Sequence, residues 1–158
     1  METRLDLFAS PIVAKALKHY GAAAPVLMRE SSLPTATQNL VMLRASQING
    51  DGYATDVHSK NAAHAGESAT RINLVAAWRE ASVFTDAERA ALELTEQGTR
   101  LADAAGGVTD EAWANAAAHH DEEQLAALVA FIALINATNR FSVIIRQPGG
   151  GYQPAQAA

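Results

Sequence analysis

The apolar residues of this chain recur with helical spacing along almost its whole length, and this pattern constrains the fold more than any other feature. Alanine and leucine are abundant, whereas the strict apolar–polar alternation of a half-buried strand is scarce. The 158 residues, 49% hydrophobic and 18% charged, suffice for one domain with a sizeable core. We therefore predict a single all-α domain over residues 1–147, followed at 148–158 by a glycine- and proline-containing tail that is disordered.

Residues that cap or break helices mark the first boundaries. A first helix is expected over residues 10–30, with Gly21 and Pro25 as the places where it would break. Pro34 is expected to open a second helix, because the first turn of a helix does not need the backbone N–H that proline lacks. The Asn-Gly pair at 49–50 should end that helix in a turn.

A third helix is expected over residues 51–65, with Gly66 just past its end. Side chains suited to N-capping predict the starts of four further helices, at Ser68, Thr85, Thr109 and Asp121. The helix that starts at Thr85 is expected to run to about residue 104. The last helix is apolar on most sides over 126–135 and should end near Arg146, which places it at the domain centre or at a subunit contact.

Composition also narrows the function. The formal net charge is −5, and the basic residues are scattered, which argues against nucleic-acid binding. The start of the chain lacks a basic segment followed by an apolar one, and the apolar run at 126–135 is short for a bilayer. We expect no membrane partner and a cytoplasmic location.

The chain contains no cysteine. This excludes disulfides, thiolate metal ligands and redox catalysis by its own thiols. Metal binding has little support, because the candidate ligands show no recognised metal-site spacing; they are Asp51, Asp56, His58, His64, His119 and His120. The last two of these are expected to be solvated. We predict no metal and no cofactor.

Several stretches resemble the alkylhydroperoxidase AhpD-like proteins of the carboxymuconolactone decarboxylase family. They are LVMLRASQING at 40–50, His58 with Gly66, NLVAAWREA at 73–81, FTDAERAALELTE at 84–96 and INATNR at 135–140. The resemblance covers about 33–146. It implies an AhpD-like helical fold with a central helical hairpin, assembly into homo-trimers or hexamers, and hydroperoxide reduction or decarboxylation as the family activity.

The resemblance also marks the candidate site. In peroxidase members a Cys-x-x-Cys pair follows the SQING-like stretch, and a histidine comes four residues after the second cysteine. The cysteine positions hold Asp51 and Ala54 here, whereas the histidine is kept as His58. The family's relay glutamate, twelve residues before the first cysteine, corresponds to Asn39. We therefore assign Asn39 and Ala54 to a residual substrate-binding pocket.

Two interpretations stay open for Asp51 and for His58. Asp51 is either a helix N-cap or a functional carboxylate. His58 is either an acid/base catalyst or a histidine hydrogen-bonded within a helix interface. Seven residues of regular helix separate the two by about 10 Å, so we do not expect them to pair directly. Asn136, Asn139 and Arg140 suggest buried hydrogen bonding or a subunit contact.

Three functions follow from these residues. The leading prediction is a divergent family member that cannot reduce hydroperoxides itself and binds a small organic molecule in the residual pocket. The second is a thiol-independent lactone or carboxylate enzyme that uses His58 as acid/base. The third is a non-catalytic oligomeric protein with a structural or interaction role.

Overall fold

The computed structural model describes residues 2–103 and 106–154, and within them every regular element is a helix. The all-α prediction is therefore confirmed. In chain order the elements are η1 (Leu7–Ala9), α1 (Pro11–Glu30), α2 (Thr35–Ile48), α3 (Gly52–His64), α4 (Ala69–Leu74), η2 (Val75–Glu80), α5 (Asp86–Thr99), α6 (Asp110–His119) and α7 (Glu122–Ile145).

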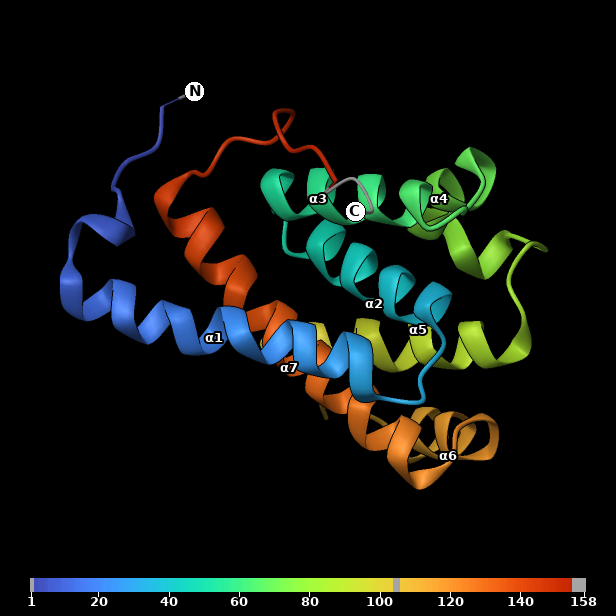
Figure 1. The fold of residues 1–158 in the computed structure, drawn as a ribbon. Coiled ribbons are helices and arrows are strands. Elements are labelled where there is room, and N and C mark those ends of the chain that lie inside the picture. The colour runs from blue at the N-terminus through green and yellow to red at the C-terminus, as the bar shows by residue number, and fades with distance from the viewer. Residues whose placement is uncertain (1, 104–105, 155–158) are drawn as a thin grey trace.

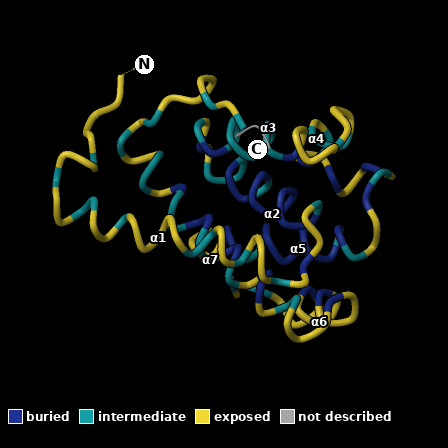
Figure 2. Tube along the Cα trace, viewed as in Figure 1, coloured by how far each residue is buried: buried dark blue, intermediate teal, exposed yellow. Residues whose placement is uncertain are grey.

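Helix α2 is the centre of the molecule. It packs against α3, α5 and α7, while α1 crosses α7 on one side and α6 lies against α5 and α7 at the end away from α3 (Figure 1). Helices α2 and α3 are joined by a tight turn and form the central hairpin that the family resemblance implied. Figure 2 shows α2 buried along most of its length and α1 largely exposed.

The core consists of two groups of apolar side chains that share α2. The larger group joins α2 to α5 and α7 and includes Val41, Met42, Ala91, Leu94, Leu128 and Phe131. The smaller group joins α2 to η2 and α5 and includes Leu40, Leu43, Val75, Trp78, Phe84 and Leu92. Because α2 is packed on two sides, it is buried around most of its circumference, and its buried residues include the polar Gln38, Asn39 and Ser46.

The capping residues act as the sequence predicts. Ser68, Thr85, Thr109 and Asp121 each accept a hydrogen bond from the backbone N–H three residues later. Thr85 and Asp121 form complete capping boxes with Glu88 and Gln124. Gly50 and Gly66 have φ values of 66° and 95°, as expected of residues that end helices in the left-handed region.

Three boundaries differ from the predictions. Helix α1 continues through Gly21 and Pro25 without a break. Gly21 supplies the carbonyl that the ring of Pro25 crowds, and a residue without a Cβ can adjust its backbone there. Helix α5 ends at Thr99, whereas its predicted end at 104 lies outside the described residues. The helix after Ser68 changes to a 3₁₀ helix at Val75.

Helix α7 passes a length and composition test for crossing a membrane, with a mean hydropathy of 1.8. The central helix of a water-soluble bundle passes the same test. Helix α7 packs against α1, α2, α5 and α6, and 33% of its most apolar stretch is buried within this chain.

Candidate functional site

Asp51 is the N-cap of α3. Gly50 reverses the chain after α2, and Asp51 follows in an extended conformation, so that its Oδ1 accepts a hydrogen bond of 3.0 Å from Ala54 N. The capping prediction is thereby confirmed. The residue is 2% exposed, which is unusual for an aspartate and requires partners for both carboxylate oxygens.

The second oxygen of Asp51 is bound by α7. Oδ2 accepts a hydrogen bond of 2.9 Å from Asn139 Nδ2, which also donates to Ser46 Oγ over 3.2 Å. Asn139 is fully buried, and its Oδ1 accepts from Asn49 Nδ2 over 2.9 Å. Asn49 Nδ2 also donates to Asn136 Oδ1 over 3.0 Å. A chain of amides therefore connects Asp51 and the α2–α3 turn to α7.

His58 lies two turns further along α3 and does not pair with Asp51, as expected. Its side chain is partly buried, and Nδ1 is fully buried without a hydrogen-bond partner among the described residues. Burial lowers the pKa of His58 from 6.5 to about 4, so the imidazole is neutral at physiological pH. Leaving a buried nitrogen without a hydrogen-bond partner costs folding free energy. Nδ1 is therefore the atom in this region that most clearly lacks a hydrogen bond.

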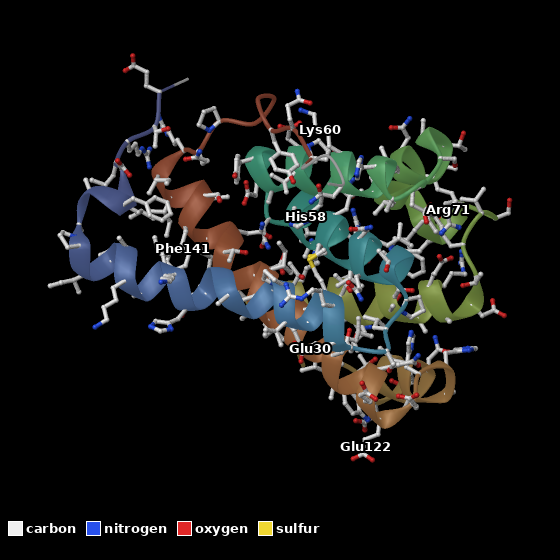
Figure 3. All side chains as sticks on the ribbon, viewed as in Figure 1. Glu30, His58, Lys60, Arg71, Glu122 and Phe141 are labelled. Atoms are coloured by element: carbon white, nitrogen blue, oxygen red, sulfur yellow. The ribbon has the colours of Figure 1, made fainter. Side chains whose placement is uncertain are left out.

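The structure places all four predicted site residues on the central hairpin. Asp51, Ala54 and His58 belong to α3 and its cap, and Asn39 lies on α2, which packs against α3. Figure 3 labels His58 on α3. Asn39 is 2% and Ala54 is 8% exposed. Their assignment to substrate binding stays a prediction.

A cavity of about 680 Å³ lies at the start of α3. Gly50, Asp51 and Gly52 form one wall, and residues from the end of α7 and the segment after it, including Val143, Arg146 and Pro148, form the other. Of the four predicted residues only Asp51 lines this cavity. The contribution of the C-terminal residues has no signal in the sequence, because it depends on where the chain returns after α7.

The described part of the C-terminal segment lies against α3, and the disorder expected over residues 148–158 stays a prediction. Gly150 N and Tyr152 N donate to Asp56 Oδ2 over 2.8 and 3.2 Å, and Lys60 Nζ donates to the carbonyls of the same two residues. Tyr152 Oη donates to Asn61 over 2.9 Å. Residues 155–158 of the predicted tail lie outside the described residues.

Asp56 is the main anchor of this segment. Hydrogen bonding to Lys60 lowers the pKa of Asp56, with smaller effects in the same direction from the backbone N–H groups of Gly150 and Tyr152. Its carboxylate is thus engaged in holding the C-terminal segment against α3. Among residues 2–103 and 106–154, no group of three His, Asp or Glu side chains is arranged to bind a metal ion.

His120 corrects one expectation. Its neighbour His119 is exposed, but His120 is 6% exposed, and its Nδ1 is 3.0 Å from the carbonyl oxygen of Ala116. His120 follows the last residue of α6 and closes that helix end, so its role is structural.

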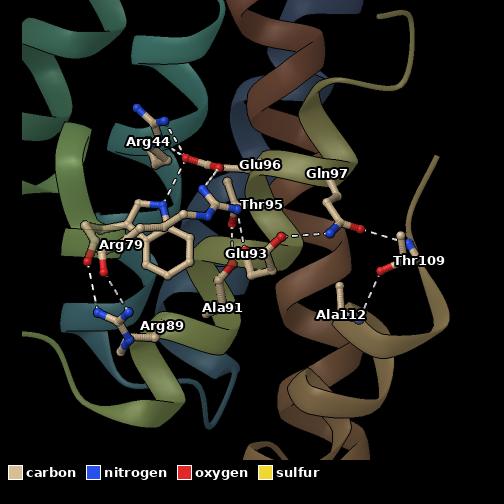
Figure 4. Close-up of polar contacts among 11 residues, drawn as sticks. Arg44, Arg79, Arg89, Ala91, Glu93, Thr95, Glu96, Gln97, Thr109 and Ala112 are labelled. Atoms are coloured by element: carbon tan, nitrogen blue, oxygen red, sulfur yellow. Dashed lines mark hydrogen bonds and ion pairs between the residues drawn. The ribbon is translucent and has the colours of Figure 1, made fainter. Parts of the chain in front are cut away.

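A buried ion-pair cluster on α5 was not singled out from the sequence. Glu96 accepts hydrogen bonds from Arg44 Nε over 2.7 Å, from Trp78 Nε1 over 2.9 Å and from Arg79 (Figure 4). Burial alone would raise the pKa of Glu96, but the bonds from Arg79, Trp78 and Arg44 outweigh it, so the pKa lies below its ordinary value. The cluster ties α2 and η2 to α5.

Comparisons with known proteins agree with this architecture. Residues 13–97 match the model of the carboxymuconolactone decarboxylase family. An uncharacterised protein of Bacillus subtilis, YdfG, is 37% identical over 115 residues, which cover 73% of this chain and 77% of the relative.

Solved structures extend the agreement to nearly the whole fold. A protein of unknown function from Agrobacterium tumefaciens, provisionally assigned to antioxidant defence as AhpD, has a TM-score of 0.86 at 33% identity, over 96% of this chain and 100% of its own. A variant of the debrominase Bmp8 in complex with 2,3,4-tribromopyrrole has a TM-score of 0.77 at 19% identity, over 90% of this chain and 73% of its own; this shows the fold alone. The chain belongs to the carboxymuconolactone decarboxylase family, as an AhpD-like member that has no cysteine.

Proposed function

We propose that this protein binds a small organic molecule at the start of α3 and does not reduce hydroperoxides by itself. The observation that carries the proposal is that a helix-capping aspartate, Asp51, stands where peroxidase members have a reactive cysteine. Asp51 takes the place of the first cysteine, engages both oxygens in hydrogen bonds, and still lines a cavity of about 680 Å³. Such a cavity is within the size range of sites for small molecules.

His58 supports binding more than catalysis. His58 does not line the cavity itself, so its buried Nδ1 gains a hydrogen bond only from a ligand whose hydroxyl or carboxyl group extends about 10 Å along α3 from Asp51. With a pKa of about 4, the neutral imidazole is a weak base at physiological pH and is rarely protonated. The low pKa weakens the alternative of a thiol-independent lactone or carboxylate enzyme. The unpaired Nδ1 is the atom that would act as the base in that alternative.

A thermal-shift screen tests the proposal. Small lactones, carboxylates and hydroperoxides would be compared on the wild type, His58→Ala and a control, His64→Ala, which removes an exposed histidine from the same helix. A stabilising ligand should lose its effect in His58→Ala and keep it in His64→Ala. Equal stabilisation of all three proteins would refute the role of His58. A melting temperature that no compound of the panel raises would refute ligand binding.

A second variant tests the cavity itself. Val143 is 43% exposed and lines the cavity, so Val143→Trp should fill the space without disturbing the core. Ligand stabilisation should disappear in this variant. Undiminished stabilisation would place the ligand elsewhere. In a parallel assay, the pure wild type should consume cumene hydroperoxide with dithiothreitol no faster than buffer, and turnover above that level would overturn the loss of peroxidase activity.

We further propose that the protein is a homo-oligomer, as expected for its family. Apolar side chains near the start of α1 and the end of α7 are exposed: Phe8 by 70%, Ile12 by 83% and Ile144 by 65%. The two regions are adjacent, since Arg4 N donates to Ile145 O over 2.7 Å. Light scattering should show a trimer or hexamer that Ile12→Glu weakens; a monomeric wild type would refute the proposal.

A further inference from the structure

A second hollow is lined by residues of α5, α6 and α7 and of the segment between α5 and α6. Its volume is about 560 Å³, and none of the candidate residues of α3 lines it. The walls are almost entirely apolar, with the largest side chains being Leu94, Leu101, Val108, Trp113, Val129 and Ile132. Leu101, Trp113 and Val129 are 61%, 46% and 43% exposed, so the hollow opens to solvent.

The hollow is elongated along α7. Val129, Ala133, Ala137 and Arg140 all line it, and residues spaced by three or four share one face of a helix. The eleven steps from the first to the last of these residues span about 16 Å of helix. The shape therefore suits a linear apolar group better than a compact one.

The polar groups lie toward one end. Arg140 Nη1 donates to the carbonyl of Asn136 over 2.8 Å, which holds the guanidinium at the rim of the hollow. Asn136 Nδ2 is itself satisfied by Thr99 Oγ1 over 3.0 Å. Among the residues that the structure describes, no carboxylate forms an ion pair with Arg140, so its charge is available to a ligand.

A neighbouring hollow of about 360 Å³ shares Arg140 with the first and is also lined by Asp103. Arg44, Arg100 and Arg140 line it together. Arg44 is paired with Glu96, and Arg100 with Asp103 over 3.2 Å, whereas Arg140 has no such partner within the described ranges. The apolar hollow thus ends beside an uncompensated guanidinium, which binds a carboxylate well because it offers several N–H donors.

We propose that this second site binds a linear amphipathic monocarboxylate, such as a medium-chain fatty acid, with its chain along α7 and its carboxylate at Arg140. The inference is independent of the proposed ligand site on α3. Concave shape, size and charge at one end favour a small molecule over a second copy of the chain, which would bring a broad apolar surface.

Decanoate tests the proposal, because Trp113 lies in the wall of the site and Trp78 is buried elsewhere. Decanoate should change tryptophan emission saturably in the wild type, and the change should vanish in Trp113→Phe while calorimetry still detects binding. Arg140→Gln should weaken binding of decanoate about tenfold or more, but leave 1-decanol unaffected. Ala133→Glu, at an exposed position of the wall, should abolish binding of decanoate.

Two results would overturn the proposal. Equal affinity for decanoate and 1-decanol, unchanged in Arg140→Gln, would remove the carboxylate from the site. Absence of binding, with Trp113 emission that depends on protein concentration, would show that a second copy of the chain covers the hollow. His58→Ala should leave decanoate affinity unchanged, so failure of one site can be separated from failure of the other.

Discussion

Asp51→Ala should destabilise the protein far more than loss of an ordinary helix cap. The substitution removes the hydrogen bond to Ala54 N, which is worth about 1 kcal/mol as an N-cap. It also removes the bond from Asn139 Nδ2 to a buried carboxylate, worth roughly 1.5–3 kcal/mol. Together the loss is about 2.5–4 kcal/mol, or roughly 5–15 °C in Tm for a chain of this size.

Asp121→Ala is the matched control. Asp121 caps α7 with the same geometry, accepting from Gln124 N over 2.8 Å, but it is exposed, and no other helix in the described part of the chain binds its carboxylate. Its loss should cost only about 1 kcal/mol. Urea denaturation followed by the emission of buried Trp78 measures both. Equal costs, within about 0.5 kcal/mol, would refute the argument that Asp51 joins α3 to α7.

The other predictions concern pH, the C-terminal segment and the ion-pair cluster. Because the pKa of His58 falls from 6.5 to about 4 on folding, only the unfolded state binds a proton at this residue between these pH values. The free energy of unfolding should therefore fall by up to roughly 3 kcal/mol as the pH drops from 6.5 to 4. Urea denaturation at several pH values should show this fall in the wild type and a smaller one in His58→Gln. A Cβ at Gly149 would come within 2.4 Å of a backbone oxygen of α3, so Gly149→Ala should release the segment and speed its proteolysis, whereas Gly151→Ala, with open space around it, should not. Glu96→Gln should cost about 2–3 kcal/mol by leaving two arginines without their carboxylate, against about 0–1 kcal/mol for the more exposed Glu93→Gln; equal costs would count against the cluster.

Local signals in the sequence predicted most of the fold. Thr85 and Asp121 are followed three residues later by Glu88 and Gln124, and this spacing alone identifies capping boxes. For Asp51 only the residue type favoured a cap, and this was one of the two interpretations that the sequence left open. The resemblance to the family then arranged the helices, which local signals cannot do.

Contacts between distant parts of the chain could not be predicted. Asn139 is 88 residues from Asp51, and Tyr152 is 91 from Asn61, so neither contact leaves a pattern in a single sequence. The tail composition likewise gives no sign of the hydrogen bonds that Asp56 and Lys60 form with its backbone groups. Burial of His120 was missed because charged residues at 121–123 follow it, although the fold turns its ring inward.

The most direct test of the central claim is a long-range proton–nitrogen NMR spectrum of His58. It would be recorded with saturating amounts of each lactone, carboxylate and hydroperoxide of the screening panel. If a small molecule occupies the residual site, at least one compound should shift the Nδ1 resonance strongly, because that nitrogen gains its missing partner. An unchanged resonance while a compound binds saturably would contradict the account.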